Sequence, residues 1–260
     1  MNKTIISWTN VSWNPVHGCT RVSDGCRHCY AEALSLRYGW THKPWTKQNE
    51  TENVQIKPHK LNDPYKLKIP SRIFVNSMSD MFHPLIPDDY RREIFRVMRE
   101  CPQHTFQVLT KRPELAARWP AQEWADNIWM GASVEDARVI GRIDHLRKCP
   151  AKTRFISAEP LIGDWQEHVD LTDIHWLIVG GESGSDFRPM PHAWARHLRD
   201  LCVSQNVAFF FKQSSAARTE MGTSLRHDDG SFWTWQQWPD QRDEPRPAEP
   251  HRYTCENSAA

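Results

Sequence analysis

The segment Thr105-Phe-Gln-Val-Leu-Thr-Lys-Arg-Pro113 carries the pattern that decides the fold of this chain. Residues 105–109 are mostly apolar, so they predict a short buried strand. Lys111 and Arg112 follow this strand directly, and a helix is predicted over residues 113–118. A buried strand that ends in charged residues and passes straight into a helix is one βα unit.

The same unit recurs along most of the chain. Strands are predicted over residues 72–76, 105–109, 128–131, 154–156, 176–179 and 208–211, with an earlier one near 11–16. Helices are predicted over residues 88–99, 113–118, 135–147 and 192–204. About seven strands in alternation with helices favour an α/β fold of the partial (β/α) TIM-like barrel type. A doubly wound open sheet is the alternative.

Each predicted strand ends in unusual polar residues. Active sites of parallel barrels form at the carboxyl ends of the strands, and Glu159 and Glu182 have no role in making turns. We therefore predict catalytic roles for Glu159 and Glu182. The residues predicted to bind a cofactor are Asp80, Glu135, Gly180, Gly181, Glu182 and Lys212. Lys111 and Arg112 are predicted to hold a phosphate or carboxylate of a substrate.

An ordinary structural role is the alternative for these carboxylates. Each glutamate at a strand end can pair with a nearby arginine, for which Arg154 and Arg188 are the candidates. Such a pair would serve stability and leave ligand affinity unaffected.

Three cysteines lie close together near the start of the chain. Cys19, Cys26 and Cys29 have the spacing C-x6-C-x2-C. Three thiolates bind a [4Fe–4S] cluster and leave one iron free for another ligand. The alternative is a zinc site that His17 or His28 completes. The remaining cysteines are scattered, as expected of small buried apolar residues: Cys101, Cys149, Cys202 and Cys255.

Composition narrows the class of protein. The chain of 260 residues is long enough for one barrel-sized domain, and 33 basic against 32 acidic residues give a net charge of +1. Bulk charge therefore does not indicate nucleic-acid binding. The 13 tryptophans either stack on bases or sugars or pack an amphipathic surface. There is no apolar run of bilayer length, and free thiols without a targeting segment favour a reducing cytoplasm.

The strand–helix rhythm stops near residue 213. We expect a barrel domain with the cysteine loop over residues 1–213 and a tryptophan-containing extension over residues 214–260. Beyond Pro239 the composition, rich in proline and charged residues, predicts a disordered end.

Several motifs resemble those of a phage and bacterial three-cysteine family, whose members are labelled phage proteins (gp thirty-seven or gp sixty-eight) or a domain of unknown function. The resemblance covers roughly residues 5–213 and rests on segments 13–19, 26–32, 73–80, 103–113, 131–136, 157–161, 179–184 and 210–213. That family is similar to radical S-adenosylmethionine enzymes. The resemblance implies a barrel of the radical S-adenosylmethionine type, with a [4Fe–4S] cluster on Cys19, Cys26 and Cys29.

The chain also departs from the common radical-enzyme pattern. The first cysteine gap is six residues instead of three, and His28 stands where an aromatic residue is usual. The Gly180-Gly181-Glu182 motif follows a late strand instead of an early one, so its role does not transfer directly. In the phage-type family a Trp-Gly pair often follows residue 213, where this chain has Ser214 and Ser215.

Two hypotheses of function follow. The first is an iron–sulfur enzyme that cleaves S-adenosylmethionine with electrons from a reducing donor and acts on a nucleotide or nucleic-acid substrate. The second is a non-catalytic module that binds zinc and recognises nucleic acid or a partner protein. The substrate, the electron donor and the oligomeric state are not set by the sequence.

Overall fold

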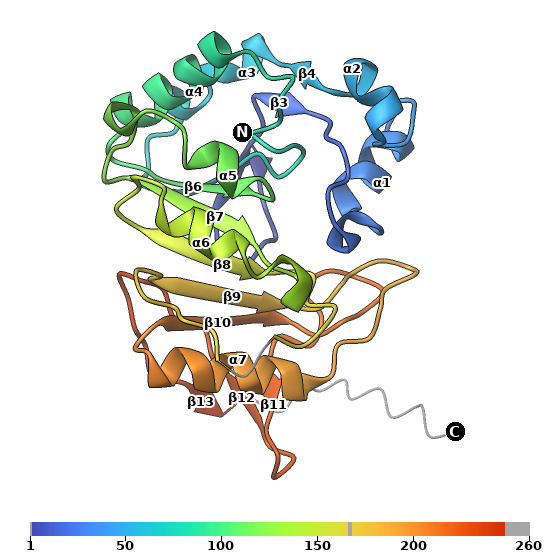
Figure 1. Ribbon diagram of the computed structural model, residues 1–260, viewed down its shortest axis with the longest axis vertical. Helices are drawn as coiled ribbons and strands as arrows, with labels where there is room; N and C mark the ends of the chain where they lie inside the picture. Colours follow the sequence, from blue (N-terminus) through green and yellow to red (C-terminus); the bar gives the residue numbers. More distant parts are fainter. Residues whose placement is uncertain (1, 166–167, 248–260) are drawn as a thin grey trace.

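Seven parallel strands form one curled sheet, and the molecule is an α/β half-barrel (Figure 1). This computed structural model describes residues 2–165 and 168–247. The parallel strands are β2 (Val11–Trp13), β5 (Arg72–Val75), β6 (Thr105–Thr110), β7 (Ile128–Ser133), β8 (Arg154–Ala158), β9 (Trp176–Gly180) and β10 (Ala208–Gln213). They stand side by side in chain order, and β1 (Asn2–Lys3) pairs antiparallel with β2 at one edge. The predicted partial-barrel architecture is thereby confirmed.

Helices connect the strands at short intervals. The helices that follow the central strands are α4 (Asp88–Glu100), α5 (Pro113–Ala116), α6 (Arg142–Arg147) and α7 (His192–Ser204). Between β2 and β5 the chain forms α1 (Tyr30–Arg37), α2 (Glu50–Asn53) and α3 (Pro58–Leu61), with a small ribbon of β3 (Val16–His17) and β4 (Gln55–Ile56). Helix α4 buries Ile94, Phe95, Val97 and Met98, the face that its periodicity predicts.

The prediction of a helix over residues 135–147 is wrong for the first half of that range. Asp136 has extended backbone angles, and its side chain accepts a hydrogen bond from the amide of Arg138. It therefore caps a short 3-10 turn at Ala137–Val139, and the α-helix begins only at Arg142. The side chain of Glu135 is held elsewhere, by contacts across the sheet described below.

The two faces of the sheet differ in what covers them. Side chains of α4, α6 and α7 pack with alternate strand residues such as Phe106 and Val108 in one large core. The opposite face carries a separate apolar cluster to which no helix of the described residues contributes. Helices on one face only are the arrangement of a half-barrel, whereas a doubly wound sheet carries them on both. The doubly wound alternative is therefore excluded.

Aromatic rings fill the inner face of the half-barrel at the amino end of the strands. The cluster consists chiefly of Trp8, Phe74, Trp129, Phe155, Trp176 and Phe210. The ring of Trp8 lies 4.7 Å from that of Phe74 and 6.3 Å from that of Trp176, centroid to centroid. Burial of one such ring contributes about 2–3 kcal/mol. This end of the half-barrel is packed, and polar groups on the inner face lie towards the other end.

The extension after residue 213 packs on the body. It forms a small antiparallel sheet of β11 (Leu225–Arg226), β12 (Phe232–Thr234) and β13 (Arg246–Pro247), drawn below α7 in Figure 1. Between these strands the chain pairs with β10, because Phe211 donates its amide to Trp235 O and Gln237 donates its amide to Phe209 O. The otherwise free edge of the barrel sheet is thus covered.

The end that the sequence predicts to be disordered divides into two parts. Residues 240–247 make contacts, since β13 pairs with β12 and Asp240 forms an ion pair with Arg72 at 3.0 Å. Residues 248–260 lie outside the described part of the chain.

The helices are short compared with a bilayer. The longest, α4 and α7, have 13 residues each. At about 1.5 Å per residue they extend only about 20 Å, against a hydrocarbon core of about 30 Å. In the described ranges, no helix combines the length and apolar character that a membrane crossing requires.

Candidate functional site

The predicted site residues gather at the carboxyl edge of the sheet. Side chains two positions apart on a strand point to the same face, and on several strands the inner face continues from an aromatic residue to a polar one. On β8 this sequence runs from Phe155 to Ser157 and on to Glu159, and on β10 from Phe210 to Lys212. Helix α1, which follows the cysteine loop, lies on the side to which the arrowheads of β9 and β10 point (Figure 1).

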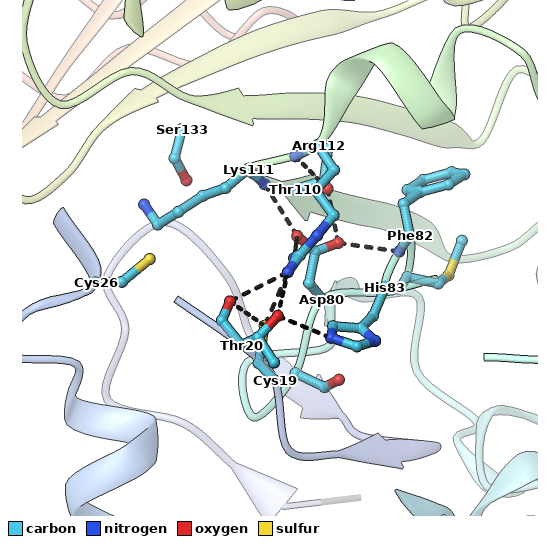
Figure 2. Close-up of polar contacts among 12 residues, drawn as sticks. Cys19, Thr20, Cys26, Asp80, Phe82, His83, Thr110, Lys111, Arg112 and Ser133 are labelled. Carbon is cyan, nitrogen blue, oxygen red and sulfur yellow. Dashed lines mark hydrogen bonds and ion pairs between the residues drawn. The ribbon is translucent and has the colours of Figure 1, made fainter. Parts of the chain in front are cut away.

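Asp80 and Arg112 form a buried ion pair at this edge. Arg112 Nη1 donates to Asp80 Oδ2 at 2.8 Å, and Thr110 Oγ1 donates to Asp80 Oδ1 at 2.6 Å (Figure 2). Burial acts to raise the pKa of Asp80, but the guanidinium and the hydrogen bonds outweigh it and hold that pKa below its usual range. Asp80 is therefore ionised at neutral pH.

Arg112 also connects this ion pair to the cysteine loop. Its Nη2 donates to Thr20 Oγ1 at 2.8 Å and to Thr20 O at 3.1 Å, and its Nη1 lies 3.6 Å from Cys19 Sγ. Thr20 Oγ1 also lies 3.0 Å from His83 Nε2, within the network that Figure 2 shows. One arginine at the end of β6 thus fixes the first cysteine segment against the sheet.

Glu135, which follows β7, fixes a second point of the loop. It accepts hydrogen bonds from Lys111, from Ser23 Oγ at 2.9 Å and from Arg142 Nη1 at 2.8 Å. Burial acts to raise the pKa of Glu135, and the charges of Lys111 and Arg142 lower it below the ordinary value. A side chain at Gly25 would overlap Glu135, because a Cβ there would lie 2.4 Å from Glu135 Cγ. Glycine therefore allows the loop to approach the carboxylate.

Glu182 fixes a third point. Its Oε2 accepts hydrogen bonds from the amide and Nε of Arg188 and from His28 Nδ1 at 3.0 Å. Arg188 also donates to Asp24 O at 3.1 Å. Glu182 and Arg188 therefore form the glutamate–arginine pair that was the alternative to a ligand-binding role. This pair holds the loop segment that contains Asp24 and His28. Arg154 does not pair with Glu159; it lies near Asp173 instead.

Glu159, which follows β8, and Lys212 of β10 form a pair across the intervening strand β9. Lys212 Nζ donates to Glu159 Oε1, and Glu220 lies 3.8 Å from the same ammonium. Lys212 is buried and Glu159 partly so. These residues contact no group of the cysteine loop through a hydrogen bond among the described residues, so they form a separate polar pair on the inner face.

The two glycines of the Gly-Gly-Glu motif have different surroundings. A Cβ at Gly180 would lie 3.3 Å from Glu159 Cδ, so this glycine lets the carboxylate pack flat against β9. A Cβ at Gly181 would lie 2.3 Å from the backbone nitrogen of Ser215. Gly181 is therefore required for packing of the extension, a role that the sequence analysis did not assign.

The three cysteines face the strand ends. Cys26 is buried, and Cys19 and Cys29 are partly buried. Burial and the nearby Asp80 carboxylate raise the pKa of Cys19 to about 12, although Arg112 opposes this, and burial also raises the pKa of Cys29. Figure 2 shows Lys111 extending beside Cys26.

The thiols do not converge on one point. Within residues 2–165 and 168–247, no three His, Cys, Asp or Glu side chains are close enough together to hold a single metal ion. His28, a candidate zinc ligand, binds Glu182, and His17 lies beside Trp40 at a centroid distance of 5.4 Å. A cubane cluster binds each cysteine through a different iron, so its ligands stand farther apart than those of one ion. Three cysteine thiols are the donors that such a cluster uses, and the choice between a cluster and zinc stays a prediction.

The other cysteines are placed as expected. Cys101, Cys149 and Cys202 are buried in the core between sheet and helices. Cys255 lies outside the described residues.

Asn76 is a further candidate residue at this edge, which the sequence patterns did not single out. It follows β5, two positions after Phe74 of the inner aromatic cluster, and is 2 % exposed. Neither its Nδ2 nor its Oδ1 has a hydrogen-bond partner among the described residues. Its φ of 66° is a conformation that asparagine tolerates better than most residues. An asparagine directly after a buried strand was the only signal in the sequence.

Comparison with known proteins places the chain in a family. A family model described as "Protein of unknown function (DUF5131)" matches residues 3–241, so the chain belongs to that family. No curated protein and no solved structure matches it. The match confirms the resemblance to a family of unknown function, while the phage association and the similarity to radical enzymes stay predictions.

Proposed function

We propose that this chain is an iron–sulfur enzyme of the radical S-adenosylmethionine type, with a [4Fe–4S] cluster on Cys19, Cys26 and Cys29. One observation carries the proposal. Residues at the ends of three different strands fix the cysteine loop over the mouth of the half-barrel: Arg112 binds Thr20, Glu135 binds Ser23 and Glu182 binds His28. A loop held at three points positions its thiols precisely, as a cofactor site requires.

The chemistry of the loop supports this cofactor. Three thiols with no fourth ligand leave one iron of a cluster open. Such a cluster, when bound and reduced, supplies the electron that cleaves S-adenosylmethionine to a radical able to abstract hydrogen. The carboxylates that fix the loop are all occupied by protein cations, so they hold the loop and do not compete for iron.

Lys111 and Arg112 would place positive charge and hydrogen-bond donors beside the sulfur atoms. Arg112 Nη1 already lies 3.6 Å from Cys19 Sγ. Burial acts to lower the pKa of Lys111, but the neighbouring Glu135 carboxylate outweighs it and raises that pKa. Cations and hydrogen-bond donors near the sulfurs stabilise the thiolate form and the added electron. The substrate role that the sequence predicts for this pair stays a proposal, secondary to the role beside the cysteines.

The inner face offers groups for ligand recognition. We assign Glu159, Lys212 and Gly180 to contacts with S-adenosylmethionine or substrate, and Asn76 to the recognition of a base. The Asn76 amide presents a donor and an acceptor side by side, which is the pattern that pairs with an adenine edge. This amide favours a nucleotide or nucleic-acid substrate. Of the two glutamates predicted to be catalytic, Glu159 retains that assignment, and Glu182 acts by positioning the loop.

The test is cleavage of S-adenosylmethionine. Anaerobically reconstituted protein should form 5′-deoxyadenosine with dithionite, and Cys26→Ala should form none. Cys202→Ala, a buried cysteine of α7, is the matched control and should keep the activity. Full activity in Cys26→Ala, or no 5′-deoxyadenosine from protein with a full complement of iron, contradicts the proposal. Colourless protein with zinc favours the alternative, a zinc-binding interaction module.

A further inference from the structure

A surface groove lies next to the cysteine loop. Its volume is about 470 Å³, and its floor is the β3–β4 ribbon, where His17 pairs with Gln55. Trp40, His42, Lys57 and Lys60 also line it, and Lys57 precedes α3 while Lys60 lies within it.

The groove is cationic. Lys57, Lys60, His42 and His59 line it, and none of its lining residues is Asp or Glu. Lys57 Nζ is held by Gln55 Oε1 at 2.7 Å, a neutral partner that leaves its charge uncompensated. Lys60 Nζ has no ion-pair partner in the part of the chain that the structure describes. By contrast, Lys43 and Lys47 nearby are paired with Glu52 and Glu50.

Exposed aromatic rings border the same groove. Trp40 is 43 % exposed and Tyr38 58 %, and their rings stack at a centroid distance of 5.2 Å. Arg37 lies over the Tyr38 ring at 5.7 Å. Exposed stacked aromatics beside unpaired lysines combine base stacking with phosphate attraction, the two interactions by which proteins hold single strands.

The groove leads to the cysteine site. His17 of its floor is followed by Gly18 and Cys19. Asn14, another lining residue, donates to Ser77 Oγ at 3.1 Å and accepts from the Met78 amide at 3.0 Å. Ser77 directly follows Asn76, whose amide is unpartnered. The groove therefore shares its lining residues Asn14 and His17 with the segments that carry Cys19 and Asn76.

We infer that this groove binds a single-stranded nucleic acid, with phosphates on Lys57 and Lys60 and a base stacked on Trp40. The inference rests on the proposed function in taking that strand to be the substrate. Duplex nucleic acid buries its bases and gains nothing from the aromatic rings, and an acidic peptide has no bases to stack.

Binding of a labelled oligothymidylate of about 15 nucleotides, followed by fluorescence anisotropy, tests the inference on the full chain. Lys57→Ala combined with Lys60→Ala should weaken binding at least about tenfold and reduce the slope of log K against log salt by about 1.4, since each single-strand phosphate contact contributes about 0.7. Trp40→Ala should weaken binding by about fivefold or more without changing that slope. Tyr38→Ala is a second stacking variant should Trp40→Ala misfold.

Lys148→Ala combined with Lys152→Ala is the matched control, because both lysines are exposed and lie next to α6. This control should bind as the unaltered protein does. Equal loss in the control, equal affinity for duplex, or equal competition by polyglutamate overturns the inference, as does no binding at low salt. Oligouridylate in a parallel titration distinguishes RNA from DNA. Unaltered protein that cleaves S-adenosylmethionine but does not bind the strand overturns the groove alone, whereas strand binding by unaltered protein that cannot hold iron overturns the proposed function alone.

Discussion

At the scale of single residues, the site is a set of buried carboxylates with protein cations as partners. Glu135 is 1 % exposed and forms ion pairs with both Lys111 and Arg142. Removing one member of a buried ion pair leaves the other charge buried without a partner. The free energy lost in this way is larger than the net stabilisation that the intact pair provides.

Glu135→Gln should therefore lower the free energy of unfolding by about 3 kcal/mol. It should also weaken iron retention, because Ser23 loses its charged acceptor. Urea unfolding and iron content measure the two effects. Glu93→Gln, on the exposed side of α4, is the control and should change the free energy of unfolding by less than about 1 kcal/mol. Equal stability of Glu135→Gln and the unaltered protein would contradict this account.

His83 makes the stability of the protein depend on pH. Burial and the charge of Arg112 lower the pKa of His83 to about 4, from 6.5. Its Nδ1 accepts the Leu85 amide and its Nε2 contacts Thr20, an arrangement that only the neutral ring satisfies. Between pH 4 and pH 6.5, His83 binds a proton more readily in the unfolded chain than in the folded one. The stabilisation by the neutral ring is thus complete above pH 6.5 and is lost as the pH falls towards 4.

We expect the urea midpoint to fall between pH 6.5 and pH 4. The fall should be shallower in His83→Gln, which lacks the titrating ring. His145→Gln replaces an exposed histidine of α6 and should keep the original pH dependence. If His83→Gln and the unaltered protein lose stability in parallel, the pH dependence comes from other groups.

The sequence indicated which residues reach the site, but not what they contact there. Glu159 and Glu182 were predictable because each follows a buried apolar run, and such runs end at one edge of a parallel sheet. Their partners were not predictable by the same route. Glu135 meets Ser23 across 112 positions of chain, and only the packing of the loop on the sheet brings the two together.

At the scale of elements, the strands were more predictable than the helices around them. A buried strand is an apolar run, and its position survives any tertiary arrangement. The short elements between β2 and β5 depend instead on contacts with distant residues. Trp13 Nε1, for example, donates to Lys60 O of α3 at 2.8 Å, and the Trp45 amide donates to Glu32 of α1 at 2.9 Å.

The last described strand permits a test of the extension. Truncation after Pro239 removes β13 and the Arg72–Asp240 ion pair, whereas truncation after Pro247 keeps both. The shorter protein should unfold at lower temperature than the longer one, by a free energy of about 1–2 kcal/mol for one exposed ion pair and one short strand. Equal melting temperatures would show that residues 240–247 contribute nothing to stability. Both proteins lack the residues after Pro247, so the difference in stability comes from residues 240–247 alone.

At the scale of the whole molecule, the half-barrel separates packing from chemistry. Aromatic rings fill the amino end of its inner face, and polar side chains, the cysteine loop and the cationic groove occupy the carboxyl end. The βα repeat predicted this polarity. It also predicted a partial barrel, but not which segments pair with the two edge strands. Here β1 covers one edge and residues 235–237 cover the other.

The metal content of the anaerobically purified chain tests the central claim most directly. We predict brown protein with about four irons and four sulfides per chain. Replacement of Cys19, Cys26 or Cys29 by alanine should abolish this content, and replacement of Cys101, Cys149 or Cys202 should preserve it. Colourless protein with about one zinc per chain, or equal iron loss in Cys202→Ala, would contradict the account.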